Sequence, residues 1–271
     1  NYWGRDIPAV RGRYNFDVLR YEVYRDATVV REALRKGLID AWTEEDFRYW
    51  HNAYNTPAVE KGWLKKTRRN YGMEVGIRRI ITFNLRKFKF TDRRVRQALT
   101  LALNFEWWNQ TLQFGYGARA HSYWQDTELA AVGLPSEDEM VLLAEYRDQL
   151  PTELFTQPFR FSKVNTQAKH RANMEKARKL LDEAGWTIRN GKLRSKDNEH
   201  FEIEFISQNS EDKRLLLPYF KQLAQLGITA KIRLMESSQY INRLRKFEFD
   251  AMVQDSTLIM PPILELSLIH I

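Results

Sequence analysis

The second half of the chain alternates between segments with strand spacing and segments with helix spacing. Phe201–Ser207 and Ile228–Met235 alternate apolar and polar residues, as half-buried strands do. Between them, Asp212–Leu226 has helical spacing and stops at Gly227. A succession of strand, helix and strand packs helices against a sheet. The sequence therefore predicts an α/β lobe.

Neighbouring segments extend this alternation on both sides. We expect a helix over Asn173–Ala184, a hairpin over Trp186–Leu193, a short helix over Gln239–Lys246 and a last strand over Phe249–Asp255. Upstream, Glu137–Leu150 is expected to be helical and Pro151–Lys169 to be a polar surface excursion.

A separate pattern lies near the start of the chain. Asn15–Tyr24 alternates like a strand. Ala27–Lys36 has helical spacing, and Gly37 stops this helix before a new strand opens at Asp40. The succession predicts a βαβ-like unit.

Composition narrows the functional classes. The 271 residues, 43% hydrophobic and 13% aromatic, can bury a core and form one to two domains. Lys and Arg number 43 against 35 Asp and Glu, so the net charge is +8; this favours acidic partners, although the basic residues are dispersed. The absence of cysteine excludes disulfides and thiolate metal sites. No apolar run of about 18 residues occurs.

Motifs for catalysis or metal binding are absent from the sequence. The histidines at positions 51, 121, 170 and 200 are isolated, and no HExxH, GxSxG, Walker A or GxGxxG string occurs. We therefore expect no catalytic residues, no metal, no cofactor and no enzyme activity.

Ile81–Asn109 reads ITFNLRKFKFTDRRVRQALTLALNFEWWN, which predicts a strand, a basic turn and an amphipathic helix. Thr91 or Asp92 can cap this helix, and Phe105–Asn109 is expected to continue it. Its apolar positions fall on one face: Val95, Leu99, Ala102 and Leu103. Its arginines at 93, 94 and 96 are interpreted as surface or salt-bridged residues, with a direct ligand role as the alternative.

Several separated motifs resemble one transport family in the order that the family shows. They are the Asp-x-Arg-Val-Arg-x-Ala-Leu helix that begins at Asp92, YRDATVVREALRKGLIDA, ARKLLDEAGW and LGITAKIRLMESSQYINRLRKFEFDAMV. Together they resemble the extracytoplasmic solute-binding proteins of the peptide/nickel type, family 5. Within that family, YWGRDIPAVRGRYNFD, ELAAVGLPSEDE and NRLRKFEFD are most similar to the Yej-type microcin C and oligopeptide binding proteins. One departure is Thr257–Glu265, where the branch has a Ser-Pro-Gly-Asn-Glu-like loop.

The resemblance implies an α/β, two-lobed periplasmic binding protein of the class II (cluster C) type, present as a fragment. We expect residues 1–81 to be a partial first lobe, 82–250 a nearly complete second lobe and 251–265 the start of the strand that returns to the first lobe. Residues 266–271, LSLIHI, match the translation of a transposon mosaic end used in sequencing libraries. The alternative for these six residues is a short apolar strand.

The same resemblance implies a substrate-binding component of an ABC importer. Its ligands would be oligopeptides, with microcin C-like peptide-nucleotides as a special case, and its partners the permease and ATPase subunits. We expect a monomer in the periplasm, without bound nucleic acid, whose signal peptide is lost or lies outside this sequence.

Candidate ligand-binding residues fall where the chain is expected to cross between lobes. They are Thr82, Phe83 and Asn84 at the first crossing, and Gln254, Asp255, Ser256 and Thr257 at the second. The resemblance adds Arg243, which could bind a ligand carboxylate or form a salt bridge to Asp250 or Glu248. Asp255 could accept a peptide amino terminus or be a turn residue, and Phe83 could instead be a core residue.

A loop rich in aromatic and basic residues supplies further candidates. Tyr116, Arg119, Tyr123 and Trp124 could stack on a peptide or nucleotide-like ligand, with ordinary packing as the alternative. Two other functions stay open. One is a basic nucleic-acid-binding module that uses Trp107, Trp108, Lys65–Arg69 and Arg93–Arg96. The other is a binding protein for sugars or opines.

Overall fold

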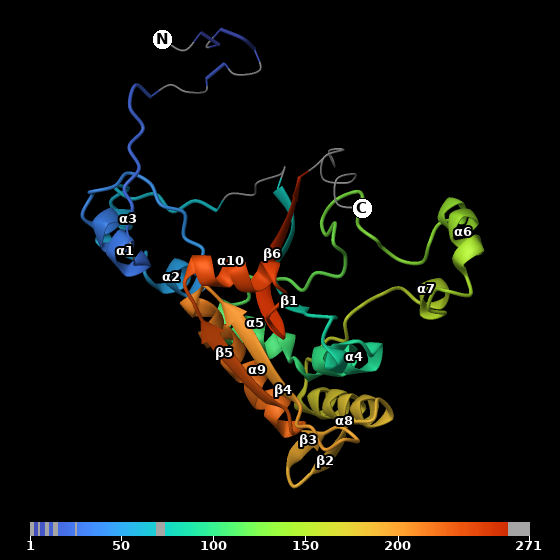
Figure 1. Cartoon of the computed structure of the whole chain (residues 1–271). Helices are drawn as coiled ribbons and strands as arrows, with labels where there is room; N and C mark the ends of the chain where they lie inside the picture. The colour runs from blue at the N-terminus through green and yellow to red at the C-terminus, as the bar shows by residue number, and fades with distance from the viewer. Residues whose placement is uncertain are drawn as a thin grey trace. The chain divides into compact units, whose positions relative to one another are not determined.

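The computed structural model describes residues 3–4, 6–8, 11–12, 16–24, 26–68 and 74–259, and the backbone alone at 74–76 and 257–259. The chain divides into two compact units, Asn1–Thr67 and Arg68–Ile271. Figure 1 labels the elements of each unit. The run 266–271, for which we expect an adapter translation, lies outside the described residues, as does most of the Thr257–Glu265 departure.

The described residues of the first unit form three short helices, α1 (Ala27–Arg35), α2 (Phe47–Asn52) and α3 (Pro57–Glu60). Two of them are capped by aspartates, because the Asp26 side chain accepts from Thr28 N and the Asp46 side chain accepts from Arg48 N. The expected helix over Ala27–Lys36 is therefore confirmed, to within one residue of its end.

The strands expected on both sides of α1 are wrong. Residues 16–24 and 38–46 form no strand, so the described part of this unit contains no βαβ arrangement. The alternating apolar side chains of the first segment are exposed, with Val23 at 95% and Val18 at 81%. A strand needs a neighbour to complete its ladder. The described residues of this unit supply no such neighbour, so the alternating pattern alone does not make a strand.

Glu44 organises the packing of the first unit. Arg31 holds its carboxylate with two hydrogen bonds of 2.7 and 2.9 Å, and the Tyr54 hydroxyl donates a third at 2.8 Å. The Arg31 guanidinium also lies over the Tyr49 ring, 3.4 Å from its centroid. Burial alone would raise the pKa of Glu44, but these hydrogen bonds and one from the Asp46 N–H hold it below its usual value. The ion pair therefore ties α1 to the segments around α2.

The second unit is built on a four-stranded sheet in the order β1-β6-β4-β5. Its strands are β1 (Glu74–Phe83), β4 (Glu202–Ser207), β5 (Thr229–Leu234) and β6 (Ala251–Ile259). β1 pairs with β6 antiparallel, while β6, β4 and β5 run parallel. A separate hairpin joins β2 (Thr187–Arg189) to β3 (Lys192–Arg194). The strands and hairpin expected in the second half of the chain are confirmed.

The second unit also contains helices. They are α4 (Arg93–Ala102), α5 (Phe105–Gln113), α6 (Glu137–Leu143), α7 (Glu153–Thr156), α8 (Gln167–Glu183), α9 (Ser210–Gln225) and α10 (Ser237–Arg245), with 3-10 turns at Phe88–Phe90 and Ala144–Tyr146. Two expectations need correction. The helix expected over Glu137–Leu150 ends at Leu143, and the one expected to continue to Asn109 breaks at Leu103, after which Asn104 caps α5. In the described part of the chain, no helix is long and apolar enough to cross a membrane.

The main hydrophobic core lies between the sheet and helices α4, α8 and α9. Ile203 and Phe205 of β4 point into this core, where they belong to one cluster with Val95 and Leu99 of α4, and all four are fully buried. The next residue, Ile206, faces the opposite side, where it packs with residues around α10. The alternation along β4 therefore gives the sheet two covered faces.

The expected amphipathic helix is confirmed as α4. Asp92 is its cap, with the carboxylate accepting from Arg94 N at 2.8 Å. Arg94 also pairs with Asp92 at 2.7 Å, and Arg96 donates to Phe90 O and Thr91 O. The surface interpretation of these two arginines therefore agrees with their contacts.

Asn84 fixes the end of the β1–β6 pairing. Its Nδ2 donates to Phe247 O and Phe249 O, both at 2.9 Å, and its backbone N donates to Asp250 O. Phe247 has a left-handed backbone with φ of 55°. A side chain other than glycine rarely adopts this conformation, so the amide of Asn84 holds a strained turn in place.

Replacing this amide should weaken the fold. We expect Asn84→Ala to lower the free energy of unfolding by about 1–3 kcal/mol, because two carbonyl groups, one of them buried, lose their donor. Urea denaturation of the complete gene product measures the change. Asn165→Ala, at an exposed position, is the matched control. Equal stability of the two variants would contradict the role assigned to Asn84.

Candidate ligand-binding site

The β1–β6 pair is interrupted by a bulge at its centre. The register runs without a break from Phe83↔Ala251 to Ile80↔Gln254 and shifts between Ile77 and Ile80. Arg79 lies in this bulge with φ of 59°, a left-handed value. A bulge of this kind redirects a side chain out of the regular ladder.

The redirected Arg79 side chain binds two carboxylates at the start of α9. Its Nη2 lies 2.7 Å from Glu211 Oε2, and its Nη1 lies 3.2 Å from Asp212 Oδ1. Its backbone N–H donates to Asp255 Oδ1 of β6 at 2.8 Å. One residue therefore connects β1, β6 and α9.

The carboxylates of Glu211 and Asp212 are largely buried, whereas that of Asp255 is exposed. Burial raises the pKa of Asp212, and the neighbouring charges of Glu211 and Asp255 raise it further. The Ser207 hydroxyl opposes this rise by donating to Asp212 Oδ2 at 2.5 Å, and the charge of Arg79 opposes it as well. The charged form of Asp212 is therefore stabilised by the cation and the hydroxyl donor that face it.

Arg214 links the cluster to α5. Its Nη2 pairs with Glu211 Oε1 at 2.9 Å, and its Nη1 donates to Leu112 O at 3.4 Å. We call Arg79, Glu211, Asp212, Arg214 and Asp255 the junction cluster. It joins the paired strands to two helices of the same unit.

All four candidate residues of the second crossing lie on β6, in the junction cluster or next to it. Gln254 donates from Nε2 to Thr82 Oγ1 at 3.0 Å, which joins two candidates across the strands. Asp255 belongs to the junction cluster, and Ser256 pairs in register with Ile77. The backbone of Thr257 pairs with Gly76, while its side chain lies outside the described residues.

Other candidates at the first crossing have structural contacts. Phe83 packs against the core with its ring centroid 5.0 Å from that of Phe90, in agreement with its alternative interpretation as a core residue. Asn84 is 4% exposed and makes the turn contacts described above. Contact of either residue with a ligand stays a prediction.

The salt-bridge partner proposed for Arg243 is wrong. Arg243 Nη1 lies 3.1 Å from Glu204 Oε1, rather than beside Asp250 or Glu248. The carboxylate of Asp250 is instead bound by Lys89 Nζ at 2.8 Å and by the Glu204 N–H at 3.0 Å. Asp250 faces these groups, so it does not meet Arg243.

The candidate loop that follows α5 has mixed exposure. Tyr123 is 69% exposed, while Tyr116 and Trp124 are half-buried. Arg119 is also half-buried, and its guanidinium lies 4.0 Å from the centroid of the Phe161 ring. The structure therefore places these four residues in one loop but gives them different surroundings.

Sequence reasoning missed Arg79, Glu211 and Asp212. Two signals could have found them. An arginine pair, Arg78 and Arg79, interrupts an otherwise apolar strand. In addition, two acidic residues occupy the first turn of α9. This helix is capped by Asn209 and follows a buried strand. That Arg79 meets these two carboxylates depends on the register of strands far apart in the chain, which the sequence pattern does not reveal.

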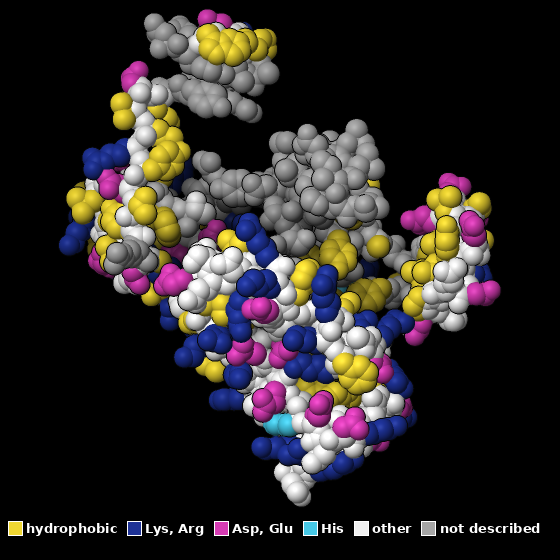
Figure 2. Space-filling view, in the orientation of Figure 1, with side chains coloured by type: hydrophobic (Ala, Val, Ile, Leu, Met, Phe, Trp, Pro, Cys, Tyr) yellow, Lys and Arg dark blue, Asp and Glu magenta, His cyan; other side chains and the backbone are white. Residues whose placement is uncertain are grey.

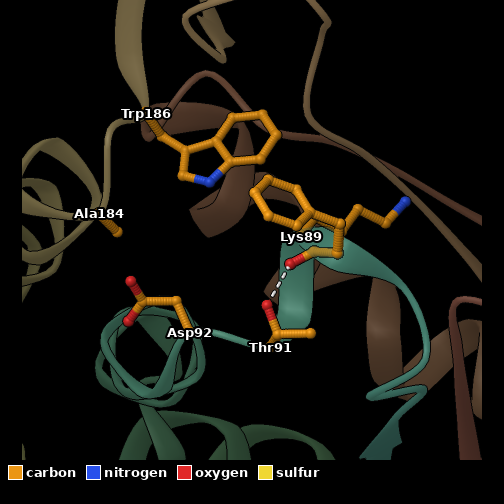
Figure 3. A pocket seen from close by; sticks show the side chains of 6 residues that line it. Lys89, Thr91, Asp92, Ala184 and Trp186 are labelled. Atoms are coloured by element: carbon orange, nitrogen blue, oxygen red, sulfur yellow. Dashed lines mark hydrogen bonds between the residues drawn. The ribbon is translucent and has the colours of Figure 1, made fainter.

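A hollow of about 320 Å³ lies between the start of α4 and the end of α8. Figure 3 shows its lining, with Trp186 and Asp92 facing one another across it and Thr91 bonded to the preceding turn. Its polar side chains are engaged in the fold, because Lys89 binds Asp250 and Asp92 caps α4. The hollow is therefore a weaker candidate for a ligand than the junction. Among the described residues, no group of three or more acidic or histidine side chains could hold a metal.

The bulge conformation and the ion pairs of Arg79 can be separated by mutation. We expect Arg79→Ala to lower the free energy of unfolding by about 1–3 kcal/mol, because it leaves two half-desolvated carboxylates without their cation. Arg79→Gly should be more stable than Arg79→Ala by about 1 kcal/mol, since glycine accepts the positive φ.

Chemical denaturation of both variants in the complete gene product measures this difference. Arg189→Ala, on an exposed hairpin position, controls for the loss of an arginine. If the glycine variant is no more stable than the alanine variant, the left-handed bulge does not exist in solution.

The family model for bacterial extracellular solute-binding proteins, family 5 (middle region), matches residues 1–265. The chain therefore belongs to this family. The resemblance identified from its motifs is confirmed, including its similarity to the Yej-type members.

Three curated relatives illustrate the similarity. The probable peptide-binding protein YejA of Agrobacterium fabrum is 36% identical over 256 residues, which cover 94% of this chain and 42% of that protein. YejA of Escherichia coli is also 36% identical, with 93% of this chain and 42% of that protein covered. The peptidoglycan-binding protein YepA of Agrobacterium fabrum is 31% identical, with coverage of 94% and 42%. The chain thus spans about two fifths of the length of these relatives.

Solved structures share the fold. The oligopeptide-binding protein AppA of Bacillus subtilis, in complex with a nonapeptide, gives a TM-score of 0.61 at 23% identity and covers 90% of this chain and 42% of that chain. NikA of Brucella suis, in complex with Fe(III)-EDTA, gives 0.58 at 21% identity, with coverage of 89% and 41%. The prediction of an α/β periplasmic binding protein fold, with one lobe partial, is confirmed.

Proposed function

We propose that the complete gene product is the substrate-binding component of an ABC importer and captures oligopeptides in the periplasm. The family match over residues 1–265 is the observation that carries this proposal. A relative at 36% identity that is named as a probable peptide-binding protein favours peptides as the ligand class. The loaded protein would deliver its peptide to the permease and ATPase subunits of the importer.

The junction of β1 and β6 is the proposed place of binding. An extended peptide presents its backbone groups and its charged termini in the same way whatever its side chains are. Polar side chains at the junction, such as Thr82 and Gln254, already hydrogen-bond across the two strands. Small changes in their rotamers would let them bind a peptide backbone instead, without changing the strand register.

Asp255 is the proposed partner of the peptide amino terminus. Its Oδ1 accepts from the Arg79 N–H, and no described residue donates to its Oδ2. A carboxylate that is fixed through one oxygen presents the other to an ammonium group in a defined direction. Electrostatic attraction would then select ligands with a free amino terminus.

A peptide-nucleotide of the microcin C kind is a special case of this proposal. Its peptide portion would use the same strand junction. The exposed ring of Tyr123 and the half-buried Trp124 could stack on the base, as aromatic side chains do on nucleotides. This case needs no site other than the strand junction and the predicted loop.

The contacts of the basic segments favour a nucleic-acid-binding module less. Arg94 and Arg96 are engaged by Asp92 and by backbone carbonyl groups. Trp108 donates its Nε1 to Leu215 O at 2.8 Å, which leaves Trp107 as the more exposed of the pair. On the face shown in Figure 2, Lys and Arg are interspersed with Asp and Glu rather than gathered in a stripe.

Peptide capture and the role of Asp255 can be tested together. The complete gene product is incubated with a library of two- to eight-residue peptides in free-amine and N-acetylated forms, and retained peptides are identified by mass spectrometry. We expect retention of free-amine peptides, reduced at least tenfold in Asp255→Asn, because the carboxylate charge is lost.

Asp197→Asn, in an exposed turn of the second unit, is the matched control and should bind like the parent protein. Equal retention of acetylated and free-amine peptides would remove Asp255 from the site. Failure to retain any peptide would contradict the proposed ligand class.

A further inference from the structure

Arg119 is a half-buried cation whose contacts are aromatic rings. Its guanidinium carbon lies 4.0 Å from the centroid of the Phe161 ring and 5.7 Å from that of Phe105. Burial lowers the pKa of Arg119, although an arginine stays charged at any physiological pH. Within the part of the chain that the structure describes, no carboxylate forms an ion pair with it. No described residue accepts a hydrogen bond from its guanidinium, so these donors are available to a ligand.

The loops around Arg119 are fixed to α5. Asn109 donates from Nδ2 to Gly117 O at 2.8 Å and accepts from Gly117 N at 3.0 Å. A Cβ at Gly117 would lie 2.8 Å from Asn109 Oδ1, so a larger residue here would displace the Asn109 amide. On the other side, Glu106 Oε2 accepts from Val164 N at 2.9 Å. One helix thus positions both the loop that carries Arg119 and the segment that carries Phe161.

His121 supplies a second donor on the same aromatic partner, with its ring centroid 5.5 Å from that of Phe161. Its Nδ1 accepts from the Phe161 N–H at 3.3 Å, which places the ring proton of the neutral imidazole on Nε2. No described residue accepts from that Nε2. Burial lowers the pKa of His121, and nearby cations lower it further, so the ring is neutral near pH 7 and keeps this tautomer.

The charge around these donors is positive. The cations that act on His121 are Arg119, Arg160 and Lys163. Against them stands Glu106, which attracts Arg119 without reaching ion-pair distance and is itself bound to a backbone N–H. A negatively charged group would therefore gain from entering this site.

We propose that Arg119 and His121 form an anion subsite that binds the carboxylate of a peptide ligand. This inference rests on the proposed function and names a second recognition point for the same ligand. The carboxylate would accept hydrogen bonds from the planar Arg119 guanidinium and from the His121 Nε2–H. The Phe161 ring, over which the guanidinium lies, would fix the orientation of the guanidinium. A phosphate offers the same acceptor chemistry and is the other source of such an anion.

Titration calorimetry on the complete gene product tests the subsite. Peptides that the parent protein retains are titrated as free acids and as C-terminal amides. We expect the free acid to bind at least tenfold more tightly. Arg119→Met keeps the apolar packing on Phe161 but loses the charge, so it should remove this preference and leave the affinity for the amide within about twofold.

Two further variants keep the result interpretable. Arg119→Lys retains the charge without the planar guanidinium, so its preference for the free acid should lie between those of the parent protein and Arg119→Met. If Arg119→Met does not fold, a weakened preference in Arg119→Lys tests the subsite instead. Arg171→Gln, at an exposed position of α8, should leave the preference unchanged.

The outcomes separate this inference from the proposed function. The subsite is overturned if the parent protein binds peptides without preferring the free acid. It is also overturned if the preference survives in both Arg119→Met and Arg119→Lys. Either result leaves peptide capture intact. If the parent protein binds no peptide, adenosine monophosphate and inorganic phosphate are titrated in its place. Binding of either one that is lost in Arg119→Met supports an anion subsite for phosphate and rejects the peptide carboxylate; no binding of any probe overturns both proposals.

Discussion

The antiparallel pairing of β1 with β6 is the constraint on which the second unit depends. Residues joined across it, such as Thr82 and Gln254, are 172 positions apart in the chain. Closing so long a loop is entropically costly, so the contacts that fix the pairing must be specific. Asn84 fixes one end through the turn at Phe247, and Arg79 fixes the centre through α9. β4 and β5 then add to the sheet beside β6.

Buried charges perform different tasks in the two units. In the first unit, Arg31 and Glu44 satisfy one another and serve the packing of short helices. In the second, the junction cluster satisfies most of its own groups but leaves Asp255 Oδ2 without a described donor. Arg119 likewise has rings rather than carboxylates as partners. Asp255 and Arg119 thus offer an acceptor and a cation that no described residue uses. From them we infer a site for an extended ligand with one positive and one negative end.

Local patterns predicted much of the second unit and little of the first. The helices, hairpin and strands between Asn173 and Asp255 follow from apolar periodicity and from the glycines that end helices. The same reasoning failed for residues 16–24, because alternation describes a face and does not supply a pairing partner. Thr82, Gln254 and Asp255 could be predicted as strand residues near a crossing. Arg79 could not be, since its role depends on a bulge and on a register set by distant residues.

Peptide capture is tested most directly by native mass spectrometry of the complete gene product purified from a bacterial periplasm, with any retained ligand released and identified. We expect a set of short peptides, each with a free amino terminus. Retained nucleic acid that is removed by salt, with no peptide present, would contradict it.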